Sequence, residues 1–226
     1  MQALVTGAAH RVGRAIALGL GAAGYKVAVH YRRSRADAEE TARLLGGAPL
    51  IEGDQAVDAQ RIGADAVRAL GGRSLLVCNA AEFEKVPSED LTRDRFDAML
   101  AANLSGPFFL MQAALPFLRR TRGSIVTLLD VCGTSQVWKG YAHYAASKAG
   151  LAALTRLLAL EWAPEVRVNG VAPGSVVEAD ERLRQRIPLG RAGNPEDVAR
   201  AVLFLAREPF ITGQILTVDG GRSVNP

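Results

Sequence analysis

The sequence predicts a doubly wound α/β domain built on a parallel sheet of about seven strands. Short apolar runs alternate with longer helix-like segments along the whole chain of 226 residues, a pattern typical of parallel sheets. The runs are continuously apolar and β-branched rather than alternating, so we expect helices on both sheet faces. No linker, repeat or low-complexity tract interrupts the chain, which predicts a single domain over 1–226.

The first part of the chain is expected to form three strand–helix pairs. These are 2–6 with 11–23, 26–30 with 34–45, and 49–52 with 56–70. Each strand is a short apolar run, and each helix is Ala-rich. Gly24 ends the first helix, and Gly46-Gly47 stops the second.

The remaining elements follow the same alternation. A fourth strand is expected over 74–78, a fifth over 124–129, a sixth over 166–171 and a last one over 213–218. Between them lie a helical stretch over 92–120, interrupted near Gly106-Pro107, and a long helix over 142–163. Proline and glycine together predict that interruption.

Composition excludes several function classes. The net charge is +4, but the arginines are spread along helices, so a nucleic-acid surface is not indicated. The longest apolar stretch, 106–118, is too short to span a bilayer. A strand that begins at Gln2 leaves no room for a signal peptide, and with only two cysteines, Cys78 and Cys132, we expect a cytoplasmic protein with free thiols. The three histidines are scattered, so no metal site is expected.

A glycine-rich turn links the first strand to the first helix. It reads Thr6-Gly7-Ala8-Ala9-His10-Arg11-Val12-Gly13. Gly7 allows a sharp turn and Gly13 allows the helix to pack closely against it. The helix N-terminus offers free N–H groups to a pyrophosphate, so the turn predicts a dinucleotide site.

The end of the second strand indicates which dinucleotide binds. It reads His30-Tyr31-Arg32-Arg33-Ser34, and the first acid is Asp37. NAD sites place an acid here for the ribose hydroxyls, and that acid would repel a 2′-phosphate. Arg33 and the Ser34 hydroxyl would instead bind the phosphate, so we expect NADPH. A basic solvated loop is the alternative interpretation.

Tyr144 and Lys148 lie four residues apart in the predicted helix 142–163 and so share one face. A nearby ammonium favours the phenolate, and we expect Lys148 to lower the pKa of Tyr144 toward a useful acid–base range.

Taken in order, the glycine-rich turn, Asn79, Asn103, Tyr144 and Lys148 resemble the short-chain dehydrogenase/reductase family over nearly the whole chain. The resemblance implies a Rossmann-like fold with Tyr144 as proton donor. It also implies that Lys148 holds the cofactor ribose, and that Asn103 positions a water and Lys148.

The same resemblance implies further cofactor contacts. Besides Gly7, Arg11, Val12 and Arg33, they are Asp54 beside the adenine, Asn79 and Ala80 beside the nicotinamide ribose, and Pro173 and Gly174 beside the nicotinamide. Asp54 could equally cap the following helix. Ser175 and the loop 176–191 would then face the substrate.

Four features resemble the pteridine reductases and dihydromonapterin reductases within that family. One is the stretch His30-Tyr31-Arg32-Arg33-Ser34 after the second strand. Arg11 replaces the usual middle glycine, and it could fork onto phosphate and reach the substrate. Asp130 stands where the family usually has a serine, although it lies 14 residues before Tyr144, one more than expected. Phe83 would stack on a pterin, or simply pack within its loop. Thr134 and Ser135 are alternatives to Asp130.

These residues predict an NADPH-dependent reductase that transfers hydride to a pteridine ring, a dihydropterin or dihydrofolate. Tyr144, Lys148, Asp130 and Asn103 would be its catalytic residues. The alternative is a carbonyl reductase of the 3-oxoacyl thioester type, and a nucleotide-sensing protein without turnover is a third possibility. The family resemblance also implies a homo-oligomer, commonly a tetramer, with a small-molecule substrate and neither nucleic acid nor membrane as partner.

Overall fold

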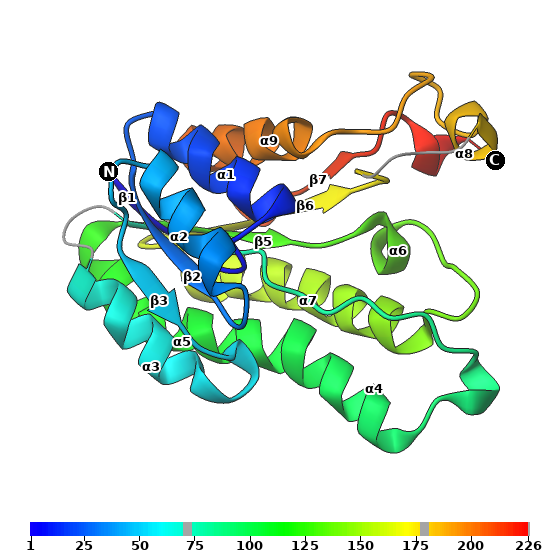
Figure 1. The fold of residues 1–226 in the computed structure, drawn as a ribbon, viewed down its shortest axis with the longest axis horizontal. Helices are drawn as coiled ribbons and strands as arrows, with labels where there is room; N and C mark the ends of the chain where they lie inside the picture. Colours follow the sequence, from blue (N-terminus) through cyan, green and yellow to red (C-terminus); the bar gives the residue numbers. More distant parts are fainter. Residues whose placement is uncertain (70–73, 177–180, 226) are drawn as a thin grey trace.

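The computed structural model describes residues 1–69, 74–176 and 181–225. They form one parallel sheet whose seven strands run in the order β3-β2-β1-β4-β5-β6-β7 (Figure 1). The strands are β1 Gln2–Val5, β2 Lys26–Tyr31, β3 Leu50–Glu52, β4 Ser74–Cys78, β5 Ser124–Leu128, β6 Arg167–Pro173 and β7 Ile215–Val218. The predicted fold class is confirmed. The strand order reverses between β1 and β4, the kind of position where open α/β sheets bind ligands.

Helices cover both faces of the sheet (Figure 1). One face carries α1 (Arg11–Ala22), α2 (Arg35–Leu44) and α9 (Pro195–Arg207), and the other carries α3 (Gln55–Ala69), α5 (Gly106–Thr121) and α7 (Ala142–Glu161). The shorter helices are α4 (Arg93–Leu100), α6 (Val131–Thr134), α8 (Glu181–Gln185) and the single turns Ser88–Asp90 and Arg222–Val224.

The central strands are buried on both sides. All five residues of β5 are buried, and so is β2 from Val27 to Tyr31. Their side chains divide between two apolar clusters, one on each face of the sheet. This division explains why the sequence shows continuous rather than alternating apolar runs.

Sequence reasoning missed α9, a helix of 13 residues. Asn194 and Asp197 form a capping box at its start, and Val198, Val202 and Leu205 are buried on one side. The sequence Asn-Pro-Glu-Asp, followed by apolar residues at helical spacing, is sufficient to predict this helix. The short helices α6 and α8 were also not predicted.

The predicted helical stretch over 92–120 forms, but its irregularity lies before Gly106-Pro107. A π-helical turn, Ala101–Ser105, joins α4 to α5 without a break. Pro107 causes no interruption because it stands at the start of α5. Arg93–Thr121 as a whole is the one helical segment of the described chain that is long and apolar enough to cross a membrane. Its residues Leu110, Met111 and Leu118 are nevertheless buried in the core, as in the core helix of a globular domain.

Candidate active site

A cleft of about 690 Å³ opens at the carboxyl ends of β1 to β4. Its lining includes most of the residues predicted to bind the cofactor: Gly7, Arg11, Val12, Arg33, Ser34, Asp54, Asn79 and Ala80. The strand order therefore brings together side chains that are up to 73 residues apart in the sequence. Lys148, Pro173 and Gly174 lie outside this lining, toward β5 and β6.

The glycine-rich turn has the geometry that the sequence predicts. Gly7 adopts a φ of +62°, which disfavours any side chain. A Cβ on Gly13 would lie 2.0 Å from the Gly7 carbonyl oxygen and 2.6 Å from Asn79 Nδ2. Arg11 also has a left-handed backbone, with a φ of +50°, at the position where the family usually has glycine. The cradle therefore exists only because Gly7 and Gly13 lack side chains.

His30 is hydrogen-bonded to the glycine-rich turn. The Gly7 N–H donates to His30 Nδ1 at 3.2 Å, and His30 Nε2 donates to the Gly53 carbonyl at 3.0 Å. Burial lowers the pKa of His30 to about 4. A neutral ring with its proton on Nε2 therefore links the turn to the end of β3. Sequence analysis assigned His30 no such role.

Asn79 links the end of β4 to the same turn. Its Nδ2 donates to the carbonyl oxygens of Thr6 and Gly7 at 2.8 and 3.2 Å. Thr6 Oγ1 accepts from the backbone N–H groups of Asn79 and Ala80, each at 2.9 Å. Asn79 thus fixes the shape of the cleft wall.

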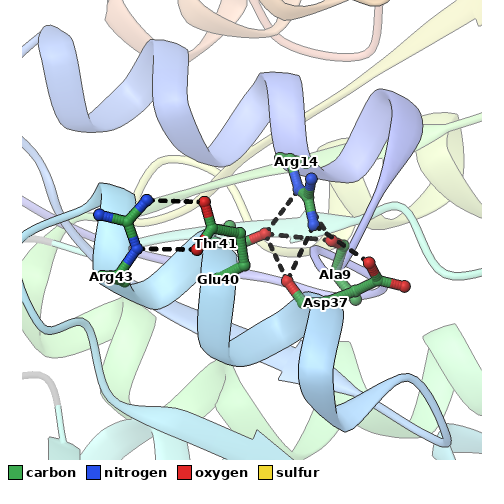
Figure 2. Close-up of polar contacts among 6 residues, drawn as sticks. All are labelled: Ala9, Arg14, Asp37, Glu40, Thr41 and Arg43. Carbon is green, nitrogen blue, oxygen red and sulfur yellow. Dashed lines mark hydrogen bonds and ion pairs between the residues drawn. The ribbon is translucent and has the colours of Figure 1, made fainter.

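Helix α2 is joined to the glycine-rich turn by hydrogen bonds of Arg14 (Figure 2). Arg14 Nε on α1 points between the Ala9 carbonyl at 3.0 Å and Thr41 Oγ1 at 2.9 Å. Arg14 Nη2 donates to the Asp37 carbonyl at 3.0 Å. The Arg43–Glu40 pair beside them stays on the surface of α2 (Figure 2). The hydrogen bonds of Arg14 fasten α1, α2 and the turn into one unit.

The two arginines after β2 have different surroundings. Arg32 forms ion pairs with Asp54 at 3.3 Å and with Glu82. Arg33 is exposed, lines the cleft and forms no ion pair with any residue that the structure describes. Like Arg11, Arg33 is therefore a cation of the cleft lining without a carboxylate partner among the described residues. Asp54 Oδ1 also accepts from the Ala56 N–H at 3.0 Å, so Asp54 caps α3 as well as lining the cleft.

Tyr144 contacts Asp130 directly. The Tyr144 hydroxyl donates to Asp130 Oδ2 at 2.9 Å, and Asp130 Oδ1 accepts from the Cys132 N–H at 2.7 Å. Asp130 therefore caps α6. The spacing of 14 residues between Asp130 and Tyr144, one more than expected, does not prevent their contact. Thr134 Oγ1 donates instead to the Asp130 carbonyl at 2.7 Å. Of the candidates beside Tyr144, the structure brings Asp130 into contact with it.

The expectation that Lys148 lowers the pKa of Tyr144 is wrong for this structure. Burial raises the pKa of Tyr144, and the negative charge of Asp130 raises it further. Lys148 Nζ donates to the Leu128 carbonyl at 2.8 Å and lies 5.8 Å from the centre of the Tyr144 ring. Burial lowers the pKa of Lys148 itself to about 8. Burial changes the pKa of Tyr144 more than the attraction between the Lys148 ammonium and the phenolate does. Burial of this kind is not visible in the sequence.

Asn103 lies in the π-helical turn, and its side-chain hydrogen bonds go to residues other than Lys148. Its Nδ2 donates to the Glu82 carbonyl at 2.9 Å and to Ser147 Oγ at 3.3 Å. Its Oδ1 accepts from the Glu82 N–H at 2.8 Å. Gln55 steadies this turn through the Ala102 carbonyl at 2.7 Å. Asn103 therefore orders the segment after β4, and its hydrogen bond to Ser147, the residue before Lys148, links it to α7.

An aromatic group stands beside Tyr144. Phe83 stacks on Tyr141 at 4.9 Å between ring centres and meets Tyr144 edge-on at 4.8 Å. Phe83 remains 57% exposed, so one ring face is open to a ligand. Ser175 accepts a hydrogen bond from Arg222. Residues 177–180 of the predicted substrate loop lie outside the described residues.

Comparison with known proteins identifies the family. The family model described as Enoyl-(Acyl carrier protein) reductase matches residues 7–223. The chain belongs to the short-chain dehydrogenase/reductase family. It is 39% identical over 236 residues to a Streptomyces violaceoruber protein named as a ketoacyl reductase of the granaticin polyketide synthase, covering 97% of this chain and 94% of the relative.

Two further short-chain reductases agree with this assignment. A 3-oxoacyl-(acyl-carrier-protein) reductase of Staphylococcus aureus is 36% identical over 238 residues, covering 97% of this chain and 96% of the relative. A crystal structure described as a short-chain alcohol dehydrogenase from Sinorhizobium meliloti 1021 matches with a TM-score of 0.92 and 32% identity, covering 100% of this chain and 97% of that one. The chain is therefore a nicotinamide-dependent oxidoreductase. The names of these relatives support the carbonyl-reductase alternative better than pteridine reduction.

Proposed function

We propose that the protein is an NADPH-dependent carbonyl reductase that acts on a 3-oxoacyl compound. The observation that carries this proposal is the Tyr144 hydroxyl, held by Asp130 at 2.9 Å at the carboxyl end of the sheet. A tyrosine hydroxyl is protonated at neutral pH, so Tyr144 can give a proton to the carbonyl oxygen as the carbonyl is reduced. The names of the ketoacyl relatives support the substrate class.

The cleft fits a dinucleotide. Because Gly13 has no side chain, α1 packs closely against the Gly7 carbonyl, and the N-terminal end of α1 faces the cleft. When bound, NADPH supplies the hydride. Arg33 would hold the 2′-phosphate, and the ammonium of Lys148 would bind the ribose hydroxyls. Asn79, fixed by Thr6, would keep the wall beside them in place.

Asp130 stands where the family usually has a serine, and carbonyl reduction requires it to be uncharged. A charged carboxylate would repel the oxyanion that forms from the substrate. Burial raises the pKa of Asp130, although its hydrogen bonds from Cys132 and Tyr144 act in the opposite direction. In its protonated form the acid could donate to the carbonyl oxygen as a serine hydroxyl does.

Pteridine reduction is the second candidate, and the pairing of Asp130 with Phe83 favours it. An ionised Asp130 could accept from the amino group of a pterin. The exposed face of Phe83, next to Tyr144, suits stacking on a flat ring. The two candidates therefore require different protonation states of Asp130.

One assay separates these functions. Purified protein is given NADPH with an acetoacetyl thioester, simple ketones, dihydrobiopterin, dihydromonapterin or dihydrofolate, and oxidation of NADPH is followed by absorbance. Turnover of the thioester, retained in Asp130→Ser and lost in Tyr144→Phe, supports the proposal. Turnover confined to pterins and lost in Asp130→Ser would establish the second candidate. No turnover of any compound would favour a nucleotide-sensing protein.

We further propose a cytoplasmic homo-oligomer, commonly a tetramer in this family. Leu151 and Leu158 on α7 are buried in the domain, whereas Leu157 and Leu160 on the same helix are 47% and 79% exposed. Phe109 on α5 is also exposed. A second subunit would cover these side chains, and sedimentation equilibrium measures the number of subunits.

A further inference from the structure

A buried arginine stands at the carboxyl end of the sheet. Arg222 follows β7 and is only 8% exposed. Its Nη1 donates to Ser175 Oγ at 2.9 Å, and its guanidinium carbon lies 5.1 Å from the centre of the Trp138 ring. Gln136 Nε2 donates to the Arg222 carbonyl at 3.1 Å. These three contacts fix both the backbone and the guanidinium.

The positive charge of Arg222 has no carboxylate within ion-pair distance among the described residues, although Asp130 and Asp219 attract it from farther away. Its Nε is buried without an acceptor. Because Nη1 is engaged by Ser175, the edge formed by Nε and Nη2 is the one without a partner, and a ligand reaches its enclosed Nε only when a neighbouring side chain moves aside. A guanidinium edge with two parallel N–H groups matches a carboxylate. Burying such a charge without a partner is costly, which favours a ligand that completes it.

Aromatic rings connect Arg222 to the catalytic tyrosine. Trp138, under the guanidinium, lies 5.8 Å from Tyr141, and Tyr141 stacks on Phe83 at 4.9 Å. Phe83 in turn touches Tyr144. Asp130 and Arg222 are also close enough for each to affect the pKa of the other. Arg222 and Tyr144 therefore border the same end of β5 and β6.

We propose that Arg222 is a specificity-determining residue whose Nε–Nη2 edge binds a carboxylate carried by the substrate beyond its reacting carbonyl. This inference rests on the proposed carbonyl reduction and sharpens it. Among small oxo compounds, the free oxo acids would be preferred to their neutral esters, and a 3-oxoacyl thioester would use Arg222 only if its acyl chain carried a further carboxylate. Trp138 would cover the guanidinium and exclude water from the ion pair.

The test uses matched pairs of substrates. Acetoacetate, 4-oxopentanoate and 5-oxohexanoate are each compared with their methyl esters, with NADPH in excess. We expect at least one acid to have a kcat/KM tenfold or more above that of its ester. In Arg222→Gln the KM of that acid should rise about tenfold with kcat nearly unchanged, while the ester is unaffected. Arg222→Lys should recover part of the loss.

Two controls make the result decisive. Arg93→Gln removes an exposed arginine of α4 and should leave kcat and KM unchanged for both the acid and the ester. Calorimetric binding of the three acids to the NADP⁺ complex reports on Arg222 without turnover. If no ketone is reduced but an acid binds through Arg222, the proposed function fails, whereas the carboxylate site at Arg222 is confirmed. Equal effects of Arg222→Gln on acid and ester, or no preference for any acid in rate or in binding, would overturn it.

Discussion

Acidification should weaken the fold through His30, the residue beneath the cofactor turn. The folded-state pKa of His30 is lowered to about 4 from 6.5 by burial. Between these two values the unfolded chain binds a proton at this residue and the folded chain does not. Stability from the neutral ring is therefore complete above pH 6.5 and is lost as the pH falls toward 4.

The expected size of this effect follows from the shift. A difference of 2.5 pKa units corresponds to about 3 kcal/mol of unfolding free energy, at 1.36 kcal/mol per unit. The free energy of unfolding is measured by urea denaturation at several pH values from 7 to 4. Wild type should lose that amount relative to His30→Asn, which carries no proton-binding ring.

The matched control is His10→Asn, because His10 is exposed at the start of α1. It should keep the wild-type pH dependence. If His30→Asn and wild type give parallel curves between pH 6.5 and 4, the neutral His30 bridge between Gly7 and Gly53 is refuted as a source of stability. Carboxylates distant from His30 affect all three proteins equally and cancel in the difference, whereas Asp58, which interacts with His30, contributes to the difference.

Three further outcomes are expected. Tyr144→Phe should lower kcat by about 10²–10⁴-fold, the usual size of a general-acid contribution, while the Kd for NADPH measured by fluorescence stays unchanged; a loss of cofactor binding would contradict its role as proton donor. Arg33→Ala should raise the Kd for NADPH at least about tenfold, because a charged hydrogen bond is lost, and should leave the Kd for NADH unchanged. The control Arg43→Ala, on the surface of α2, should change neither Kd. Leu205→Ala should lower the free energy of unfolding by about 2–5 kcal/mol in urea titrations, and an unchanged value would show that α9 is not part of the core.

Much of the fold could be predicted from the sequence because its signals are local. Apolar runs, glycines at turns and the i, i+4 spacing of Tyr144 and Lys148 are all visible within a few residues of each other. The missing parts depend on distant contacts or on burial. His30 acts through Gly7 and Gly53, each 23 residues away. The raised pKa of Tyr144 depends on burial, which no local pattern reveals. Helix α9 was the exception, since its capping box was readable.

The π-helical turn Ala101–Ser105 has a consequence for how the chain can change in length. One residue more than a regular turn is accommodated there, between two helices that continue each other. Because the wide turn absorbs that residue, deleting it would leave an unbroken α-helix with Leu110 and Met111 still on the face that meets α3. It would, however, remove the turn from which Asn103 reaches Glu82. The core therefore tolerates a segment one residue shorter, whereas the active site does not.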